Sequence, residues 1–358
     1  MTDRPFPRAT TFEDELLLCC AQVSPGSETR ARLGQLAARP LDWETVLNRS
    51  WWHRIRPLTY RHLISQPPGT VPDSVLAELA GHVSELRERN QRLSRVLANV
   101  ADYFEAAGLR GLVFKGPTLS EDAYGDLSLR ECGDLDLLVD RNDFGRIAEV
   151  LTAQGFESWW ERDDRNQQLF ACEFERSDGT LDVHWELSPA WLNYRVNFAR
   201  LWETATPLSP DRPGLRKLSP EDTLVVLCIH GAKHWWERLR WISDVAELIN
   251  RDRVKQWDRV EAAAFDARCW RSVALGLWLA GNLLSARVPS EVMRRLEATP
   301  GITRLGQQVR VWLGYAEQSP EMRTTRDRFF FRMGLCERRR DRVSQLVRYL
   351  AARPRHAK

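Results

Sequence analysis

The sequence predicts an α+β fold, in which a small mixed-sheet core is flanked by N-terminal and C-terminal helical regions. Apolar residues recur at helical spacing over residues 12–107. Short apolar runs next to glycine and proline, typical of buried strands, follow in the middle of the chain. Helical spacing returns from about Leu218. We therefore expect a helical region over 1–107, an α/β core over 108–207 and a second helical region over 208–358.

Composition excludes several classes of protein. The chain has 358 residues, of which 43% are hydrophobic and 28% charged, as in ordinary globular proteins. No stretch approaches the roughly 20 apolar residues that cross a bilayer, and no apolar secretory signal follows the N-terminus. The net charge of +3 is too small to indicate nucleic-acid binding. The seven cysteines include no CxxC pair, so we expect reduced, mostly buried thiols and a cytoplasmic protein without a membrane partner.

The N-terminal region is expected to end in one long helix. Val75–Ala107 carries apolar residues at helical spacing, interleaved with Glu and Arg, and Pro67-Pro68-Gly69 marks a loop before it. The chain also has 15 tryptophans, some in pairs such as Trp51-Trp52 and Trp235-Trp236. We expect the tryptophans to act mainly as fillers of the core and of domain interfaces.

The core begins with a short strand, a break and a second strand. Gly111–Lys115 is an apolar run after a glycine, which favours a buried strand. Gly116 ends it, and Pro117 suits the first position of a helix that runs to about Tyr124. Asp134–Val139 is the second strand candidate.

A helix and three more strands complete the predicted core. Asn142 or Asp143 could cap a helix that runs to Gln154, with Gly155 as its terminator. The strand candidates are centred on Phe156–Trp160, Gln168–Glu175 and Thr180–Leu187. Ser177-Asp178-Gly179 is a hairpin turn signal between the last two.

The C-terminal region begins with a clear helix start and ends with a basic segment. Ser219 is a good cap, Pro220 suits the first helical position, and breaks are expected near Pro289, Pro300 and Pro320. Arg338–Lys358 holds eight Lys/Arg residues and one acid. We favour a solvated helix over a site for an anionic partner. Its expected buried stripe comprises Val343, Leu346, Val347 and Leu350.

Two aspartates in the second strand are the first candidates for metal-binding catalytic residues. Alternate side chains of a strand project to the same face, so Asp134 and Asp136 point together. Their charges repel, and a divalent cation would remove that penalty. Oxygen ligands suit Mg²⁺, which keeps waters and phosphate oxygens in its remaining positions and so indicates a nucleoside triphosphate. A bare Asp-x-Asp is weak evidence, since glycosyltransferases and many turns also contain it.

A third carboxylate strengthens this interpretation. In Leu181–Trp185 the alternation places Asp182 and His184 on one face. A strand that carries Asp182 could lie beside the one that carries the pair. Three acids would then converge on two metal ions, an arrangement that activates an attacking oxygen and stabilises the leaving pyrophosphate. We expect His184 to support the site, because histidine is an uncommon magnesium ligand.

At this point the sequence resembles a known family. Lys115-Gly116, Arg130 with Gly133–Val139, and Leu181–Trp185 look like the motifs of the uncharacterised nucleotidyltransferase family of the polymerase-β-like superfamily. The resemblance extends more weakly to three further segments, which are Arg54–Tyr60, His230–Lys233 and Trp241–Val245.

The resemblance implies roles for individual residues. Asp134 and Asp136 would bind metal, and Asp182 would bind metal and act as general base. Gly116 would let its backbone approach the triphosphate. The chain departs from the usual Gly-Gly or Gly-Ser of this loop, so Lys115 would supply charge to the phosphates and either Thr118 or Ser120 the missing hydroxyl.

Other polar residues leave alternatives open. Arg130 could bind phosphate, or tie down its loop by pairing with an acid such as Glu131. His230, Lys233 and His234 share one helical face, which could reach the nucleotide phosphate, line an acceptor pocket or simply face solvent. Zinc is a poor alternative for the two histidines, because the Glu of HExxH is missing. Asp244 and Trp241 would orient this face or pack the domain.

The function expected is magnesium-dependent transfer of a nucleoside monophosphate from an NTP, such as ATP, to an unidentified acceptor. The acceptor would offer a hydroxyl or phosphate group and could be a small molecule, a peptide or a protein; the family's setting gives a faint preference for natural-product peptides. One alternative is a catalytically silent binding or antitoxin-like module on the same fold. Another is a sugar-nucleotide transferase, which would need a Rossmann-like unit before Asp134.

Overall fold

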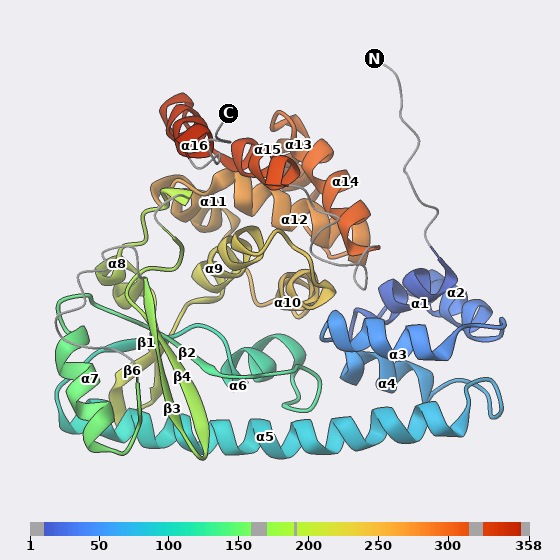
Figure 1. Cartoon of the computed structure of the whole chain (residues 1–358), viewed down its shortest axis with the longest axis horizontal. Coiled ribbons are helices and arrows are strands. Elements are labelled where there is room, and N and C mark those ends of the chain that lie inside the picture. Colours follow the sequence, from blue (N-terminus) through green and yellow to red (C-terminus); the bar gives the residue numbers. More distant parts are fainter. Residues whose placement is uncertain (1–10, 159–169, 190–191, 315–324, 352–358) are drawn as a thin grey trace, which may run out of the picture.

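The computed structural model describes residues 11–158, 170–189, 192–314 and 325–351. One long helix, α5, runs along an edge of the molecule, with the sheet over its C-terminal half and the first four helices over its N-terminal half (Figure 1). The C-terminal helices lie on the other side of the sheet from α5 (Figure 1). The described residues thus confirm the predicted α+β fold, a mixed sheet flanked by helices.

The N-terminal region is helical, as predicted. It comprises α1 (Phe12–Cys20), α2 (Ser27–Ala37), α3 (Trp43–Trp52), α4 (Arg56–Leu63) and α5 (Asp73–Ala106). The expected long helix is a single element of 34 residues. Its apolar residues lie at helical spacing and are buried, against α4 near one end and against the sheet near the other. A Rossmann-like unit before Asp134 is therefore absent from the described residues, because α5 occupies that position.

The sheet has six strands in the order β3-β4-β2-β1-β6-β5. Their bounds are β1 (Gly111–Val113), β2 (Leu135–Val139), β3 (Ala171–Arg176), β4 (Gly179–His184), β5 (Thr206–Ser209) and β6 (Arg212–Lys217). β2 pairs with β4 in parallel and with β1 antiparallel, and the β3–β4 hairpin has the predicted turn. Of the strand expected at Phe156–Trp160, Glu157 forms an isolated bridge with Glu175. Residues 159 and 160 of this candidate, and residues 168 and 169 of the candidate over Gln168–Glu175, lie outside the described residues.

Strands β5 and β6 are not among the predicted elements. β6 pairs with β1 in parallel, so the sheet continues beyond residue 207. Its sequence, RPGLRK, contains one fully buried apolar residue, Leu215, and therefore lacks the alternation that identifies a strand. Gly214 allows a close approach of chains, because an added Cβ would lie 2.9 Å from the carbonyl oxygen of Leu109.

The two faces of the sheet pack against different helices. Leu135, Leu137 and Val139 of β2 belong to a core that also contains residues of α5 and of α7 (Phe144–Ala153). Leu138 belongs to the larger core, which includes the C-terminal helices. Because strand side chains alternate, Asp136 lies on the same face as Leu138, toward the C-terminal helices. The predicted catalytic face is thus covered by the C-terminal region and not by α5.

Short elements connect β1 to the rest of the core. Pro117 begins α6 (Pro117–Leu119), which continues as the π-helical turn η1 (Ser120–Tyr124), as the sequence predicts. After β2, Asp143 precedes α7, although its side chain makes no capping hydrogen bond. Gly155, with a φ of +81°, follows the helix as expected.

The C-terminal region is helical apart from the β5–β6 hairpin. Ser219 caps α9, accepting a hydrogen bond from the Asp222 amide at 3.2 Å as predicted. Helix breaks occur at Pro289 and Pro300, whereas Pro320 lies outside the described residues. Helix α8 (Phe198–Thr204) precedes β5 within the predicted core. The helices of the C-terminal region are α9 (Pro220–Lys233), α10 (Leu239–Asn250), α11 (Trp257–Asp266), α12 (Trp270–Leu284), α13 (Ser290–Ala298), α14 (Ile302–Leu313), α15 (Thr325–Leu335) and α16 (Arg339–Ala351).

The stripe expected to be buried on the last helix is exposed. Val343 is 60% exposed, Leu346 42% and Val347 60%, and the side chain of Leu350 is not described. Gln345 is the buried residue of this part of α16, which packs against α15. The prediction of a buried apolar stripe was wrong, because α16 turns a polar residue inward.

Buried cysteines and tryptophans show how far composition predicts packing. All seven cysteines are free thiols, and six of them are buried, as expected. Trp236 is fully buried, whereas Trp51 is 58% exposed and is not a core residue. None of the described helices combines the length and the apolar character that a membrane span requires.

Candidate active site

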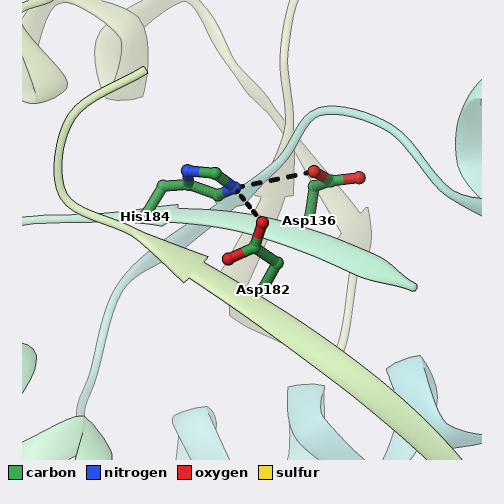
Figure 2. Close-up of side chains that lie close together, drawn as sticks. All are labelled: Asp136, Asp182 and His184. Atoms are coloured by element: carbon green, nitrogen blue, oxygen red, sulfur yellow. Dashed lines mark ion pairs between the residues drawn. The ribbon is translucent and has the colours of Figure 1, made fainter. Parts of the chain in front are cut away.

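The register between β2 and β4 brings two of the predicted carboxylates together. Asp136 and Asp182 are directly paired residues of these parallel strands, so their side chains project side by side from one face. His184, two residues further along β4, lies on the same face. Its Nε2 atom is 2.9 Å from Asp182 Oδ2 and 3.6 Å from Asp136 Oδ1 (Figure 2). The predicted neighbourhood of the two strands is confirmed.

Lys115, just after β1, places an ammonium group against Asp136. The Lys115 Nζ atom is 2.6 Å from Asp136 Oδ1 and 3.3 Å from Nδ1 of His230. Burial by itself would raise the pKa of Asp136. The charges of Lys115 and His184 outweigh it and lower that pKa below its usual range. Asp136 is therefore an ionised carboxylate in a buried position.

Asp134 immediately precedes β2 and shares the face of Asp136. Within the described part of the chain its carboxylate has no hydrogen bond or ion pair. Burial raises the pKa of Asp134, and the negative charges of Asp136 and Asp182 raise it further against the opposing charge of Lys115. The three predicted carboxylates thus lie close enough to repel one another, which is the condition that a bound cation relieves.

His184 is held between carboxylates and aromatic rings. Burial would lower its pKa, but the interactions with Asp136 and Asp182 outweigh this effect and raise it. The ring centroid lies 5.4 Å from that of Phe114 and 6.2 Å from that of Phe170. Its Nδ1 atom is buried without a hydrogen-bond partner.

Donor atoms for a metal ion converge at this point. In the described part of the chain, one group of side chains has ligand atoms close enough to share a metal, and it consists of Asp136, Asp182 and His184. The sequence predicts Asp134 as the third ligand and a supporting role for His184. The strand alternation that placed Asp182 and His184 on one face was the signal that could have found this group. The zinc alternative for His230 and His234 gains no support, since neither belongs to it.

Helix α9 presents its predicted polar face to the sheet. The ring centroids of His230 and His234 are 4.6 Å apart, and the Trp241 ring stacks on His234 at 5.1 Å. The Lys233 ammonium lies 4.4 Å from the centroid of the Phe170 ring. This face therefore lies over the site, which excludes the alternative that it simply faces solvent.

The pKa values of the polar residues at the end of α9 are lowered in this position over the site. Burial and then the charge of Lys115 lower the pKa of His230 well below its usual range. Burial and Lys115 likewise lower the pKa of Lys233 to about 8, against the opposing charges of Asp182 and Asp136. The pKa of His234 falls to about 3 through burial and the neighbouring Lys233. The two imidazoles are neutral at pH 7, and Lys233 is a cation close to titration.

The loop after β1 turns at Gly116 in a conformation that favours glycine. Gly116 has φ +73° and ψ −151°, a conformation that side chains forbid. The Thr118 hydroxyl donates a hydrogen bond to the carbonyl oxygen of Lys115 at 2.9 Å. Ser120 is fully buried, with its hydroxyl 3.5 Å from the Gly116 carbonyl oxygen and 3.4 Å from Cys132 Sγ. Both hydroxyls thus contact the loop itself.

Arg130 ties its loop to α10. Its Nε and Nη2 atoms donate hydrogen bonds to the two carboxylate oxygens of Asp244, at 2.7 and 3.0 Å. The Tyr124 hydroxyl donates to the same carboxylate at 2.7 Å. Burial would lower the pKa of Arg130, but the Asp244 charge outweighs it and raises that pKa. Of the two hypotheses for Arg130, the structure supports the one in which Arg130 fixes its loop by pairing with an acid. The acid is Asp244 and not Glu131.

Comparison with known protein families gives a match to most of the chain. A family model described as an uncharacterised nucleotidyltransferase matches residues 39–285, which is more than half of the chain. The matched segment runs from just before α3 to the end of α12 and includes every predicted site residue. No curated protein and no solved structure gives a significant match.

Proposed function

The chain belongs to this uncharacterised nucleotidyltransferase family, and from that premise we propose that it transfers a nucleoside monophosphate from an NTP to an acceptor. The acceptor would offer a hydroxyl or phosphate group, on a small molecule, a peptide or a protein. The observation that carries this proposal is the pairing of Asp136 with Asp182 across β2 and β4, with Asp134 on the same face.

The carboxylates fit a hard divalent cation. Burial and then the negative charges of its neighbours raise the pKa of Asp134, and carboxylate oxygens are the protein ligands that Mg²⁺ prefers. We propose that Asp134, Asp136 and Asp182 hold two Mg²⁺ ions, with His184 positioned beside them. The bound metal would supply neutralising charge for the triphosphate and for the departing pyrophosphate.

Side chains around the carboxylates suggest the remaining roles. Asp182 is 31% exposed at its side chain, compared with 4% for Asp136, and so suits the general base that takes the acceptor's proton. Lys115 and Lys233 would bind phosphate oxygens, with His230 holding the Lys115 ammonium. The Gly116 backbone would approach the triphosphate. Thr118 and Ser120 would shape this loop, and Arg130 would act through Asp244.

The test is binding of each labelled NTP to the full chain, with and without Mg²⁺, followed by measurement of pyrophosphate release. The wild type is expected to bind an NTP only when Mg²⁺ is present. Asp136→Asn should abolish this binding, whereas Asp182→Asn should retain binding and lose transfer. Asp102→Asn, a change of the same kind at an exposed carboxylate of α5, should alter neither. If the wild type binds no NTP in the presence of Mg²⁺, the silent binding module becomes the better interpretation.

A further inference from the structure

A second group of charged side chains lies beside the candidate active site. Arg54 and Arg56 come from the junction of α3 and α4, and Arg238 and Arg240 from the junction of α9 and α10. These four residues are called the arginine cluster below. Two segments far apart in the sequence therefore supply cations to one place.

Two backbone amides donate hydrogen bonds to His53 and hold the two segments together. The His53 carbonyl oxygen accepts from the Arg240 amide at 3.2 Å, and His53 Nδ1 accepts from the Leu239 amide at 3.3 Å. The next residue, Arg54, has a φ of +57°, which is uncommon for a residue with a side chain. The chain thus adopts an unfavourable conformation where it presents the first arginine.

The cluster has more positive charge than its acidic neighbours neutralise. Glu131 Oε1 lies 3.3 Å from Arg56 Nε, and Glu131 Oε2 lies 3.9 Å from Arg54 Nη1. The Arg240 guanidinium donates a hydrogen bond to the backbone carbonyl oxygen of Glu131, at 2.7 Å. Across the described ranges, no carboxylate forms an ion pair with Arg238 or Arg240. Their Nε atoms are buried without hydrogen-bond partners, which leaves donors for a ligand.

The lowered pKa values of Arg238 and Arg240 agree with an excess of positive charge in the arginine cluster. Burial and then the charge of Arg54 lower the pKa of Arg238, despite the nearby acids Glu237 and Glu131. Burial and then the charge of Arg130 lower the pKa of Arg240. The Arg238 guanidinium carbon also lies over two indole rings, 5.2 Å from the centroid of Trp52 and 5.9 Å from that of Trp241. These contacts restrict its orientation.

The cluster borders the site that holds the carboxylates. The charge of Arg240 acts on the carboxyl of Asp134 and on the rings of His230 and His234. Glu131, which the cluster surrounds, is three residues before Asp134 in the same loop. A ligand with one end at the carboxylates could therefore present an anionic group to the arginines.

We propose that the arginine cluster is an oxyanion site, which binds a phosphate or carboxylate group of a substrate whose reacting part lies at Asp134, Asp136 and Asp182. The inference rests on the proposed function and adds an anionic group to the description of the substrate. Guanidinium groups bind such oxyanions through paired hydrogen bonds, which explains the use of arginine at all four positions. The anion belongs either to the NTP or to the acceptor.

Inorganic phosphate in the presence of EDTA is the probe that tests this site without metal or NTP. Its affinity is measured by calorimetry for the wild type and for Arg54→Gln/Arg238→Gln. The double substitution should weaken binding about tenfold or more, because charge-assisted hydrogen bonds are lost. Arg32→Gln is the matched control, since Arg32 and Arg54 are both 38% exposed and each lies near a glutamate. Equal phosphate affinity of the double variant and the wild type, or no binding to the wild type at millimolar phosphate, overturns the proposal.

A lysine variant and a nucleotide-binding measurement extend this test. Arg54→Lys/Arg238→Lys keeps the charges but not the paired geometry, and it should also bind phosphate more weakly; it decides the matter if the glutamine variant does not fold. Binding of a non-hydrolysable NTP with Mg²⁺ then identifies the source of the anion. Lower NTP affinity of the double variant assigns the site to the triphosphate, and unchanged affinity assigns it to the acceptor. Phosphate binding without NTP binding would instead refute the proposed function and leave the oxyanion site standing.

Discussion

Substitution of Gly116 by alanine tests how the loop after β1 is built. Gly116 adopts φ +73° and ψ −151°, a region of backbone space that is essentially restricted to glycine. An added Cβ would lie 3.3 Å from Leu135 Cδ2 and 3.4 Å from the carbonyl oxygen of Asp134. The methyl group would therefore press on the residues that position the first carboxylate.

The expected loss of stability follows from two opposing terms. A residue with a side chain in this region costs about 1–3 kcal/mol. Alanine restricts the unfolded chain more than glycine does, and this effect stabilises the folded state by about 0.4–1 kcal/mol. The free energy of unfolding of Gly116→Ala should therefore fall by about 1.3 kcal/mol, the difference between the middle values of the two terms, about 2 and about 0.7 kcal/mol. The NTP affinity should fall as well, because the backbone at residue 116 is proposed to approach the triphosphate.

Urea unfolding of the wild type, Gly116→Ala and Gly133→Ala measures the effect. Gly133 lies in the adjacent loop, outside the left-handed region, and its added Cβ would meet no heavy atom within 4 Å. The same substitution there should leave stability unchanged or raise it by up to about 1 kcal/mol. If Gly116→Ala is as stable as the wild type, or if Gly133→Ala loses as much, the conformational argument is refuted.

Three further predictions concern buried charges. Arg130→Met leaves Asp244 buried without its cation and should cost about 3–5 kcal/mol in urea unfolding. Arg130→Met/Asp244→Leu should recover part of that loss, and wild-type stability of the single variant would contradict the prediction. Burial raises the pKa of Glu247 from 4.5 to about 7, so its contribution to stability is full below pH 4.5 and is lost as the pH rises through 7. Glu247→Gln should therefore gain up to about 3 kcal/mol over the wild type between pH 5 and pH 8 in thermal unfolding, and parallel pH profiles would refute this. Lys233 has a pKa lowered to about 8, so NTP affinity should decrease from pH 7 to pH 9 in the wild type but not in Lys233→Met. A decrease of the same size in the variant would exclude Lys233 as its cause.

The sequence predicts those features that depend on local periodicity. The alternation in β2 and β4 predicts that Asp134 points with Asp136 and that Asp182 points with His184, and in the structure Asp136 and Asp182 face away from the core that contains Leu137 and Val183. The same alternation placed His184 beside Asp182. Local side-chain period is fixed by backbone geometry alone, and so it can be predicted without knowledge of the tertiary structure.

Features that depend on distant segments could not be predicted in the same way. β6 is a strand because β1 offers a parallel edge to it, and its own sequence shows little alternation around Leu215. The partner of Arg130 is 114 residues away, and the nearer acid Glu131 is paired with Arg56 and His82. The prediction of a buried apolar stripe on α16 is wrong for a related reason, because amphipathic spacing does not show which face of a helix packs against a neighbour.

Helix α10 connects the two parts of the site. Through Asp244 it holds Arg130, and with it the loop that leads to Asp134 and β2. Through Arg240 it contributes to the arginine cluster and donates a hydrogen bond to the same loop at Glu131. The spacing between the carboxylates and the cluster is therefore set by one rigid helix and two contacts to one loop. A substrate that spans both places would have to match that distance, so α10 would select for substrate length as well as for charge.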